Sequence, residues 1–236
     1  PGQAGRNRKA VTRGAQVALA VSLYGVSFGA LAVAMGFDVW QTMVLSLLMF
    51  SGASQFAFIG VIGSGGLAAA TAAIASAGLL GVRNGLYGLR TSVIVGPGFW
   101  KKIAGAHLTV DESTAVATAQ PDEESAKKGF WATALVLYLG WNAASLIGAL
   151  VGDMLGDLRA WGLDAVAAAA FLGLLWPRLR AIEPIAVAAV SAAATILLVP
   201  SVAPGIPVLG AALVGILFTI FSRWRYPSSK PSSGGA

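Results

Sequence analysis

The chain has 236 residues, of which 56% are hydrophobic and only 11% are charged. A soluble domain carries about 25% charged residues, so this composition excludes a water-exposed globular surface and predicts an all-α, polytopic helical membrane protein. The 16 Lys and Arg outnumber the 10 Asp and Glu, but they sit in tails and loops between apolar runs. That placement indicates orientation in a membrane and not nucleic-acid binding.

Charge-free runs predict about seven transmembrane segments, because a spanning helix needs about 20 residues. The run from Val39 to Val82 is 44 residues long, about twice that length, so it must fold back, and the glycine-rich residues 63–66 are the natural turn. A later run breaks at Pro200, Pro204 and Pro207, where helix continuation is sterically blocked. The expected segments are 15–36, 39–63, 66–89, 129–151, 162–177, 184–199 and 207–222.

These segments predict one transmembrane domain over residues 15–222, between an N-terminal tail at 1–14 and a disordered C-terminal tail at 223–236. Within it, a first helical half at 15–89 and a second at 129–222 flank a polar insert at 90–128. The insert is expected to lie on the membrane surface, because it contains aromatic, basic and acidic clusters. A cleaved leader is not expected, since the first apolar run is too long and a second one follows at once.

Seven crossings with the N-terminus outside would place 11 of the 16 basic residues inside, against 5 for the reverse orientation. The positive-inside rule therefore favours an outside N-terminus. A short echo between residues 27–31 and 145–150, three segments apart, raises the hypothesis of a 3+3 inverted repeat plus one helix. A chance match of small residues is the competing interpretation.

The clearest polar interruption of a helix is the stretch 50–56, in the middle of the second segment. Gln55 is costly in hydrocarbon unless it finds a partner, and Gly52 weakens the helix locally. A broken helix exposes backbone groups that can bind a zwitterion. In the alternative interpretation, Ser51, Gly52 and Ser54 permit close helix packing and Gln55 bonds across it.

Other polar or small residues inside the segments are candidates of the same kind. Arg83 either extends to the interface, the usual outcome, or faces a cavity and pairs with a substrate carboxylate. Asn142 beside Trp141 is a rarer combination that could line a pathway, whereas small residues at helical spacing most often indicate packing. The candidate substrate-binding residues are Ser27, Gly29, Ser51, Gly52, Ser54, Gln55, Arg83 and Asn142. No acidic residue lies deep in the first four segments, so an ammonium group is expected to meet carbonyls, Gln55 or a partner protein.

Signatures of an enzyme are missing from the sequence. Cysteine is absent and His107, the only histidine, lies in the insert, so no metal cluster can be assembled, and no paired carboxylates sit within a span. Neither a metalloprotease motif nor a phosphate-binding loop is present. We therefore expect no catalytic residue, metal site or cofactor.

Four short motifs give the chain a family resemblance over about residues 20–120. They are Ser27-Phe28-Gly29 with Gly36-Phe37, Gly52-Ala53-Ser54-Gln55-Phe56, Arg83-Asn84 with Leu86-Tyr87-Gly88, and Leu108-Thr109 with Asp111-Glu112. In order and spacing these resemble the AzlC family, the large subunit of two-component branched-chain amino acid exporters. The family usually shows Arg-His where this chain has Arg83-Asn84, and a contiguous Thr-Asp-Glu where Val110 intervenes here.

The resemblance implies a secondary transporter subunit of the inner (cytoplasmic) membrane that exports valine, leucine, isoleucine and also methionine. It also implies a small hydrophobic membrane subunit of the AzlD type as partner. From the residues alone, two alternatives stay open: a passive channel for small solutes, and a non-catalytic scaffold subunit whose partner binds the substrate. An intramembrane enzyme would need a buried nucleophile with a base, and the sequence offers no such base.

Overall fold

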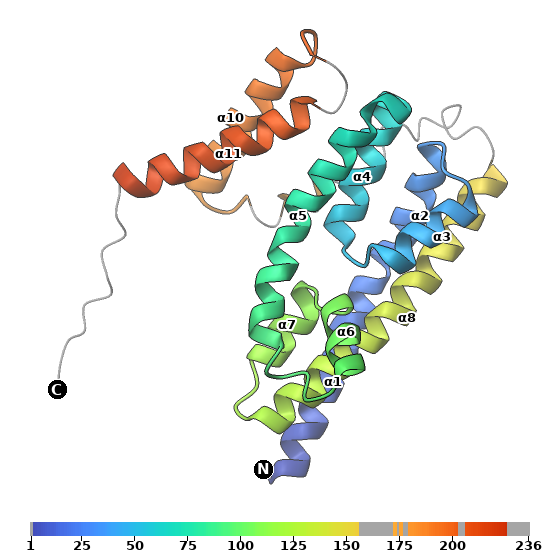
Figure 1. Ribbon diagram of the computed structural model, residues 1–236, viewed down its shortest axis with the longest axis vertical. Helices are drawn as coiled ribbons and strands as arrows, with labels where there is room; N and C mark the ends of the chain where they lie inside the picture. Colours follow the sequence, from blue (N-terminus) through green and yellow to red (C-terminus); the bar gives the residue numbers. More distant parts are fainter. Residues whose placement is uncertain (1, 156–171, 174, 177–178, 203–205, 226–236) are drawn as a thin grey trace.

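A computed structural model describes residues 2–155, 172–173, 175–176, 179–202 and 206–225. These residues form helices and no strand, which confirms the predicted all-α class (Figure 1). Three helical stretches are long and apolar enough to cross a membrane, Gln3–Ala34, Gly52–Thr91 and Glu123–Leu155. The predicted number of seven crossings is not confirmed, and the reason lies in how the helices between these stretches fold back.

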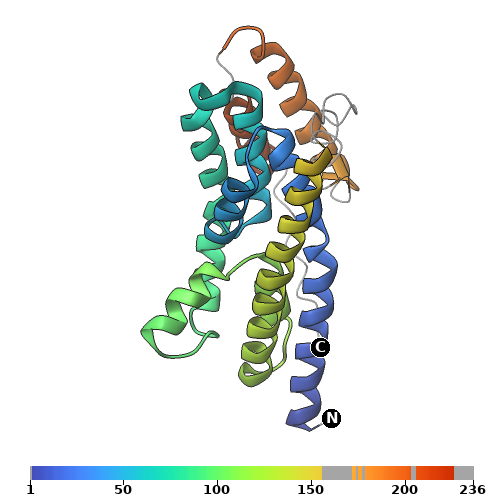
Figure 2. The ribbon, with the colours of Figure 1, turned by 90° about the vertical axis from the view of Figure 1, so that its right-hand side faces the viewer.

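The framework of the molecule is a parallel pair of long helical elements. One is α1 (Gln3–Ser22) followed after a single residue by α2 (Tyr24–Ala34), and the other is α8 (Glu123–Leu155). Residues 3–14, expected as a tail, are thus the first turns of α1. The two elements run side by side over their full length (Figure 2).

Small residues allow this close approach. A Cβ at Gly29 would collide with the backbone of Ser145, and one at Gly148 would collide with the backbone of Val26. These contacts place residues 27–31 and 145–150, the two halves of the sequence echo, against each other and in the same direction. An inverted repeat requires opposite directions, so the echo does not mark one.

The close contact between α2 and α8 predicts that glycines inside it tolerate alanine less well than glycines outside it. Gly148→Ala should destabilise the protein by about 1–3 kcal/mol, because the added methyl overpacks against backbone that cannot move aside. Gly78→Ala is the matched control, since a Cβ there meets nothing within 4 Å. Thermal unfolding in detergent measures both, and equal melting temperatures for the two variants would contradict the contact.

The predicted segment 39–63 is not one crossing helix but a hairpin of two short ones. α3 (Val39–Leu48) starts at Asp38, whose side chain and that of Gln41 form a capping box, and it ends before an extended Ser51 (φ −157°). α4 (Gly52–Gly65) then returns, so that its far end packs beside Met35 at the end of α2. The hairpin enters the bilayer from one end and leaves at the same end.

The chain next turns at Gly66, which has a positive φ of 58°, as the glycine cluster predicted. A short 3-10 helix, η1 (Gly66–Ala69), leads into α5 (Ala70–Thr91), which runs antiparallel to α4. The Ser54 hydroxyl ties the two helices by donating to the Ala77 carbonyl at 2.9 Å. With 22 residues, α5 is long enough to cross a bilayer.

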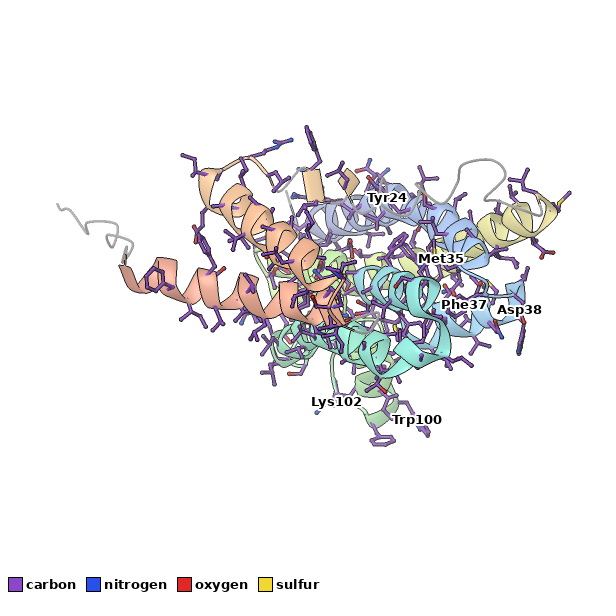
Figure 3. All side chains as sticks on the ribbon, turned by 90° about the horizontal axis from the view of Figure 1, so that it is seen from above. Tyr24, Met35, Phe37, Asp38, Trp100 and Lys102 are labelled. Carbon is purple, nitrogen blue, oxygen red and sulfur yellow. The ribbon has the colours of Figure 1, made fainter. Side chains whose placement is uncertain are left out.

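The insert does not lie flat on the surface as expected. α6 (Phe99–His107) and α7 (Asp111–Thr118) form a second hairpin that enters from the opposite end to the first. Its base carries the exposed Trp100, which points outward together with Lys102 (Figure 3). Its tip, residues 108–110, is buried, and His107 Nε2 lies 3.0 Å from the carbonyl oxygen of Leu47 near the tip of the first hairpin.

The last two predicted segments correspond to α10 (Ile182–Leu198) and α11 (Ile206–Arg225), which pack on each other. The Ser191 hydroxyl donates to the Ala211 carbonyl between them at 3.2 Å. The predicted segment 162–177 lies almost entirely outside the described residues, and so does the C-terminal tail from residue 226 onward.

Because the first hairpin does not cross, the N-terminus and the insert lie at the same end of the molecule. Arg6 forms an ion pair with Asp122 at 2.9 Å, and the Gln3 amide also donates to Asp122, at 2.7 Å. The basic residues gathered at this end are Arg6, Arg8, Lys9, Arg13, Arg90, Lys101, Lys102, Lys127 and Lys128.

The opposite end of the framework has no basic residue over residues 31–48, 60–75 and 150–155, which carry Asp38 and Asp153. By the positive-inside rule we infer that the N-terminal end faces the cytoplasm. The sequence-based preference for an outside N-terminus assumed that residues 39–63 cross the membrane, and with a hairpin there the same rule favours the opposite orientation.

Cysteine labelling tests this topology, because the native chain has no cysteine. Leu67→Cys at the far end should react with an impermeant maleimide in intact cells. Gly2→Cys and Ser92→Cys should react only after permeabilisation. If only one of Gly2→Cys and Ser92→Cys reacted in intact cells, the helix arrangement would be contradicted. If both of these reacted in intact cells and Leu67→Cys did not, only the orientation would be overturned.

Candidate functional site

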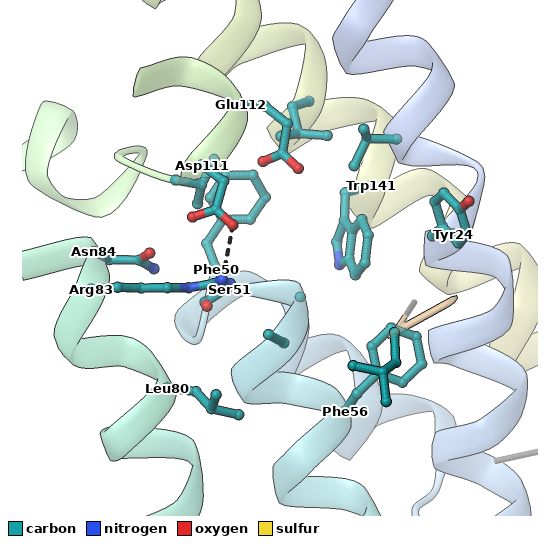
Figure 4. A pocket seen from close by; sticks show the side chains of 16 residues that line it. Tyr24, Phe50, Ser51, Phe56, Leu80, Arg83, Asn84, Asp111, Glu112 and Trp141 are labelled. Carbon is teal, nitrogen blue, oxygen red and sulfur yellow. Dashed lines mark ion pairs between the residues drawn. The ribbon is translucent and has the colours of Figure 1, made fainter. Parts of the chain in front are cut away.

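A cavity of about 390 Å³ lies where the tips of the two hairpins meet α1, α5 and α8. One of its lining residues, Trp141, sits at the middle of the charge-free part of α8, Gly129 to Gly152. The cavity therefore lies near half depth of the apolar layer. Its polar lining consists of Ser51, Arg83, Asn84, Asp111 and Glu112, and its apolar lining includes Val21, Leu80, Phe56, Leu137 and Trp141. Figure 4 shows Trp141 and Phe56 across the cavity from Arg83 and Asn84.

The tip of the α3–α4 hairpin presents the uncapped N-terminus of α4 to this cavity. Ser51 is the N-cap residue of α4, but its side chain makes no capping hydrogen bond. Its hydroxyl instead donates to the Ser54 hydroxyl at 3.1 Å. The first-turn N–H groups of an α-helix have no partner within the helix and carry partial positive charge. Gly52 and Ala53, which line the cavity, supply such groups.

The tip of the α6–α7 hairpin brings a carboxylate into the same cavity. Asp111 opens α7 and pairs with Arg83 of α5 at 2.9 Å, with both side chains about one-third exposed, at 32% and 31%. Within the described part of the chain, Arg83 Nε, Asp111 Oδ1 and Asn84 Oδ1 are buried without a hydrogen-bond partner. Buried polar atoms are normally paired, so these atoms form a set of one donor and two acceptors that a polar ligand can satisfy.

Gln55 lies behind the cavity wall, and its side chain is used within the protein. Its amide nitrogen donates to the carbonyls of Met49 at 2.7 Å and Ser46 at 3.3 Å, and its oxygen accepts from Trp141 Nε1 at 3.0 Å. The residue is fully buried. It therefore satisfies the last carbonyls of α3 and fixes the orientation of the indole that lines the cavity.

Of the other candidates from the sequence, the structure brings Ser51, Gly52 and Arg83 to the cavity. Ser54 does not line the cavity, and its hydroxyl donates to the Ala77 carbonyl of α5. Ser27, Gly29 and Asn142 do not line it. Gly29 packs on α8, and the Asn142 amide donates to the carbonyl one turn before it, at 2.8 Å.

Aromatic rings stiffen the apolar side of the cavity. Phe28, which is fully buried, stacks on Trp141 with ring centroids 6.2 Å apart and meets Phe56 edge-on at 5.8 Å. A Cβ at Gly52 would lie only 3.0 Å from the Trp141 ring. The glycine thus lets the indole lie directly against the open end of α4.

Sequence reasoning missed the residues that come from the insert. The insert that carries Asp111 and Glu112 was expected on the membrane surface, and an acidic group inside the apolar layer was not expected. The structure corrects this, because the α6–α7 hairpin carries both carboxylates to the cavity. The available signal was the short run Leu108-Thr109-Val110, which places apolar residues just before the acidic pair in an otherwise polar insert.

A comparison with family models matches residues 16–155 to the family described as AzlC protein. The match covers more than half of the chain and, except for Leu175, every residue that lines the cavity. The chain belongs to the AzlC family. Searches of curated proteins and of solved structures gave no match.

AzlC proteins are associated with the transport of branched-chain amino acids, and they work with a partner subunit. The cavity at the meeting point of α1, α5, α8 and both hairpins thus belongs to the part of the chain that defines a transporter family.

The bonding of Gln55 predicts an effect on stability. Gln55→Leu leaves two carbonyls and one indole N–H without their partner, at a cost of about 1–3 kcal/mol for each buried unsatisfied group. We therefore expect a lower melting temperature in addition to weaker transport. Gln16→Leu on the exposed face of α1 is the control and should melt like the wild type. Lost transport at unchanged stability would instead make Gln55 a direct substrate ligand.

Proposed function

We propose that this chain is the substrate-binding subunit of a secondary transporter that exports branched-chain amino acids across the cytoplasmic membrane. One observation carries the proposal: an uncapped helix N-terminus and a charged pair with unused atoms meet in a cavity that is otherwise apolar. That combination matches a zwitterion with an aliphatic side chain.

In this proposal the carboxylate of the amino acid binds between the first-turn amides of α4 and Arg83 Nε. Its ammonium binds Asp111 Oδ1 and Asn84 Oδ1, both unpartnered in the described structure. Arginine is suited to this role because its fixed fork of donors matches a carboxylate. The charge of the ligand thus completes the hydrogen bonds that the empty site leaves open.

The side chain of the amino acid lies against Phe56, Trp141 and Leu80 in this arrangement. This wall offers apolar contact and no hydrogen-bond partner, because the indole N–H of Trp141 is already bound to Gln55. Burying a polar side chain against it would leave that group unpaired. Aliphatic amino acids are therefore preferred over polar ones of the same size.

The two hairpins supply the moving parts of the proposed transport cycle. They enter from opposite ends, and at their meeting point Phe50 packs on Tyr138 and His107, with ring centroids 5.0 and 6.2 Å apart. Withdrawal of the α6–α7 tip opens the cavity toward the cytoplasmic end, and withdrawal of the α3–α4 tip opens it toward the other. Access then alternates around a fixed site.

The partner in this proposal is a small hydrophobic subunit of the AzlD type. α5 offers it a face of small residues, since a Cβ at Gly78, Gly85 or Gly88 meets nothing within 4 Å of the described atoms. Small residues let helices approach closely in lipid. Gly148 and Gly152 of α8 do not serve this purpose, because they pack on α2.

Export from cells tests the site. Cells that express this chain with its partner and are loaded with a valine-containing dipeptide should release free valine. Arg83→Gln and Asp111→Asn should lower this release by about tenfold or more, since losing a hydrogen bond to a charged group costs about 1.5–3 kcal/mol and each 1.4 kcal/mol is tenfold. Arg90→Gln, two turns away on α5 and outside the cavity, is the matched control and should export normally.

Equal efflux with and without the chain would reject the proposal. Flux that rises linearly without saturation would favour a passive channel. Full transport by the purified single chain in liposomes would reject the requirement for a partner. If the partner alone bound valine as tightly as the two subunits together, this chain would be a scaffold.

A further inference from the structure

Glu112 stands between two cavities. Together with Asp111 it lines the central cavity, and the same two residues line a second cavity of about 260 Å³. The remaining lining of the second cavity comes from α1 and α7, namely Arg13, Val17, Ala115 and Val116. Because Arg13 belongs to the basic end of the molecule, the second cavity lies on the cytoplasmic side of the first.

The charges of the central cavity do not cancel. Arg83 pairs with Asp111, whereas no salt bridge to Glu112 occurs among the described residues. Figure 4 shows the Glu112 carboxylate pointing into the cavity beside this pair. A carboxylate withdrawn from water without a cation favours its protonated form, and a neighbouring carboxylate adds to that preference.

The surroundings of Glu112 contain few other groups that titrate or carry charge. α5 contributes Arg83 across the central cavity, and α1 contributes Arg13 across the second one. α6 contributes His107, whose ring nitrogen lies against the Leu47 carbonyl. The lining residues from α4 and α8 are uncharged and do not titrate near neutral pH, and Asn84 does not titrate at all. Glu112 is thus the carboxylate in this site that is free to change its charge.

We propose, on the basis of the function proposed above, that Glu112 is the proton-binding group that couples export to the proton gradient. With the substrate ammonium in the cavity, Glu112 stays ionised because a cation lies beside it. Without substrate, it is a partly buried carboxylate with no salt-bridge partner among the described residues, and it takes up a proton. Proton and amino acid therefore exclude each other, which is the condition for exchange of one for the other.

The direction follows from the two cavities. When the site opens to the outside, a proton binds Glu112 and the amino acid leaves. When it opens to the cytoplasm, Glu112 releases the proton through the second cavity and the next amino acid binds. One proton enters for each amino acid that leaves, and no bond other than O–H is made or broken.

A proton fits this site better than a metal cation does. Hard cations such as Ca²⁺ take six or more oxygen ligands, and no group of three or more His, Cys, Asp or Glu suited to a metal occurs in the described parts of the chain. One carboxylate is enough to carry a proton. A sodium gradient is therefore the alternative that the experiment must separate.

Proteoliposomes containing both subunits separate coupling from binding. Two rates are measured: valine accumulation driven by a pH gradient, and exchange of labelled for unlabelled valine without a gradient. Glu112→Gln should lower the gradient-driven rate at least about tenfold more than it lowers exchange, because an amide cannot carry the proton. Glu112→Asp keeps a carboxylate and should retain gradient-driven transport. Glu123→Gln, at the cytoplasmic start of α8, is the matched control and should change neither rate.

The inference would be overturned if the ratio of the gradient-driven rate to the exchange rate were the same in Glu112→Gln as in the wild type. Accumulation by the wild type that follows a sodium gradient and ignores a pH gradient would also overturn it. Absence of valine exchange in the wild type would instead reject the proposed function, and the inference with it. A dye for internal pH adds a direct readout, since proton entry during valine release should be lost in Glu112→Gln and kept in Glu112→Asp.

Discussion

The structure depends on how the chain satisfies its backbone where the helix breaks at residues 49–51. In hydrocarbon every backbone polar group needs a partner, so irregular backbone occurs only where protein or a cavity surrounds it. Gln55 meets half of this requirement by donating to the carbonyls of Ser46 and Met49. The amides at the start of α4 receive no side-chain cap. The protein thus closes the carbonyl side of the break and leaves the amide side without a side-chain cap.

The parallel pair of α1–α2 and α8 makes this break tolerable. Glycines at 29 and 148 bring the two elements into backbone contact, and Trp141 of α8 reaches across to bind Gln55. The Gln55–Trp141 hydrogen bond thereby ties the start of α4 to the framework in this conformation. The hairpin tips meet each other through the ring contact of Phe50 with His107 and through the hydrogen-bond contact of His107 Nε2 with the Leu47 carbonyl, at 3.0 Å. Few contacts therefore join the two tips, compared with the three hydrogen bonds that hold Gln55.

Much of this architecture could be predicted from the sequence, and the errors concern the run 39–63 and the insert. The weak point at Gly52 and the cost of an unpaired Gln55 marked the break correctly. The length of a charge-free run, however, does not distinguish a crossing helix from a hairpin that returns, since both need apolar residues. The run 39–63 was therefore counted as a crossing, and both the orientation and the inverted repeat inferred from the sequence depended on that count. For the insert, polarity was taken to mean solvent, although acidic residues at a hairpin tip can face a cavity.

Arg83 shows why the site residues are harder to derive than the fold. From the sequence it could extend to the interface or face a cavity, because both outcomes suit an arginine near the end of an apolar run. The deciding partner, Asp111, lies in another element that sequence reasoning placed on the surface. An isolated arginine at this depth is costly, and Asp111 reduces the cost by pairing with it at 2.9 Å.

An ion pair partly withdrawn from water, such as Arg83–Asp111 with each side chain about one-third exposed, contributes little to stability compared with apolar residues of the same volume. Stability alone therefore does not explain why Arg83 and Asp111 occupy the centre of an apolar layer, where leucine and phenylalanine would pack at least as well. The pair also leaves an unpartnered atom on each residue, Arg83 Nε and Asp111 Oδ1, which a purely structural pair would satisfy. A donor and an acceptor held side by side beside an open helix N-terminus are suited to a ligand that carries both charges. Such a ligand would pair both atoms and offset the part of the cost that the ion pair itself leaves.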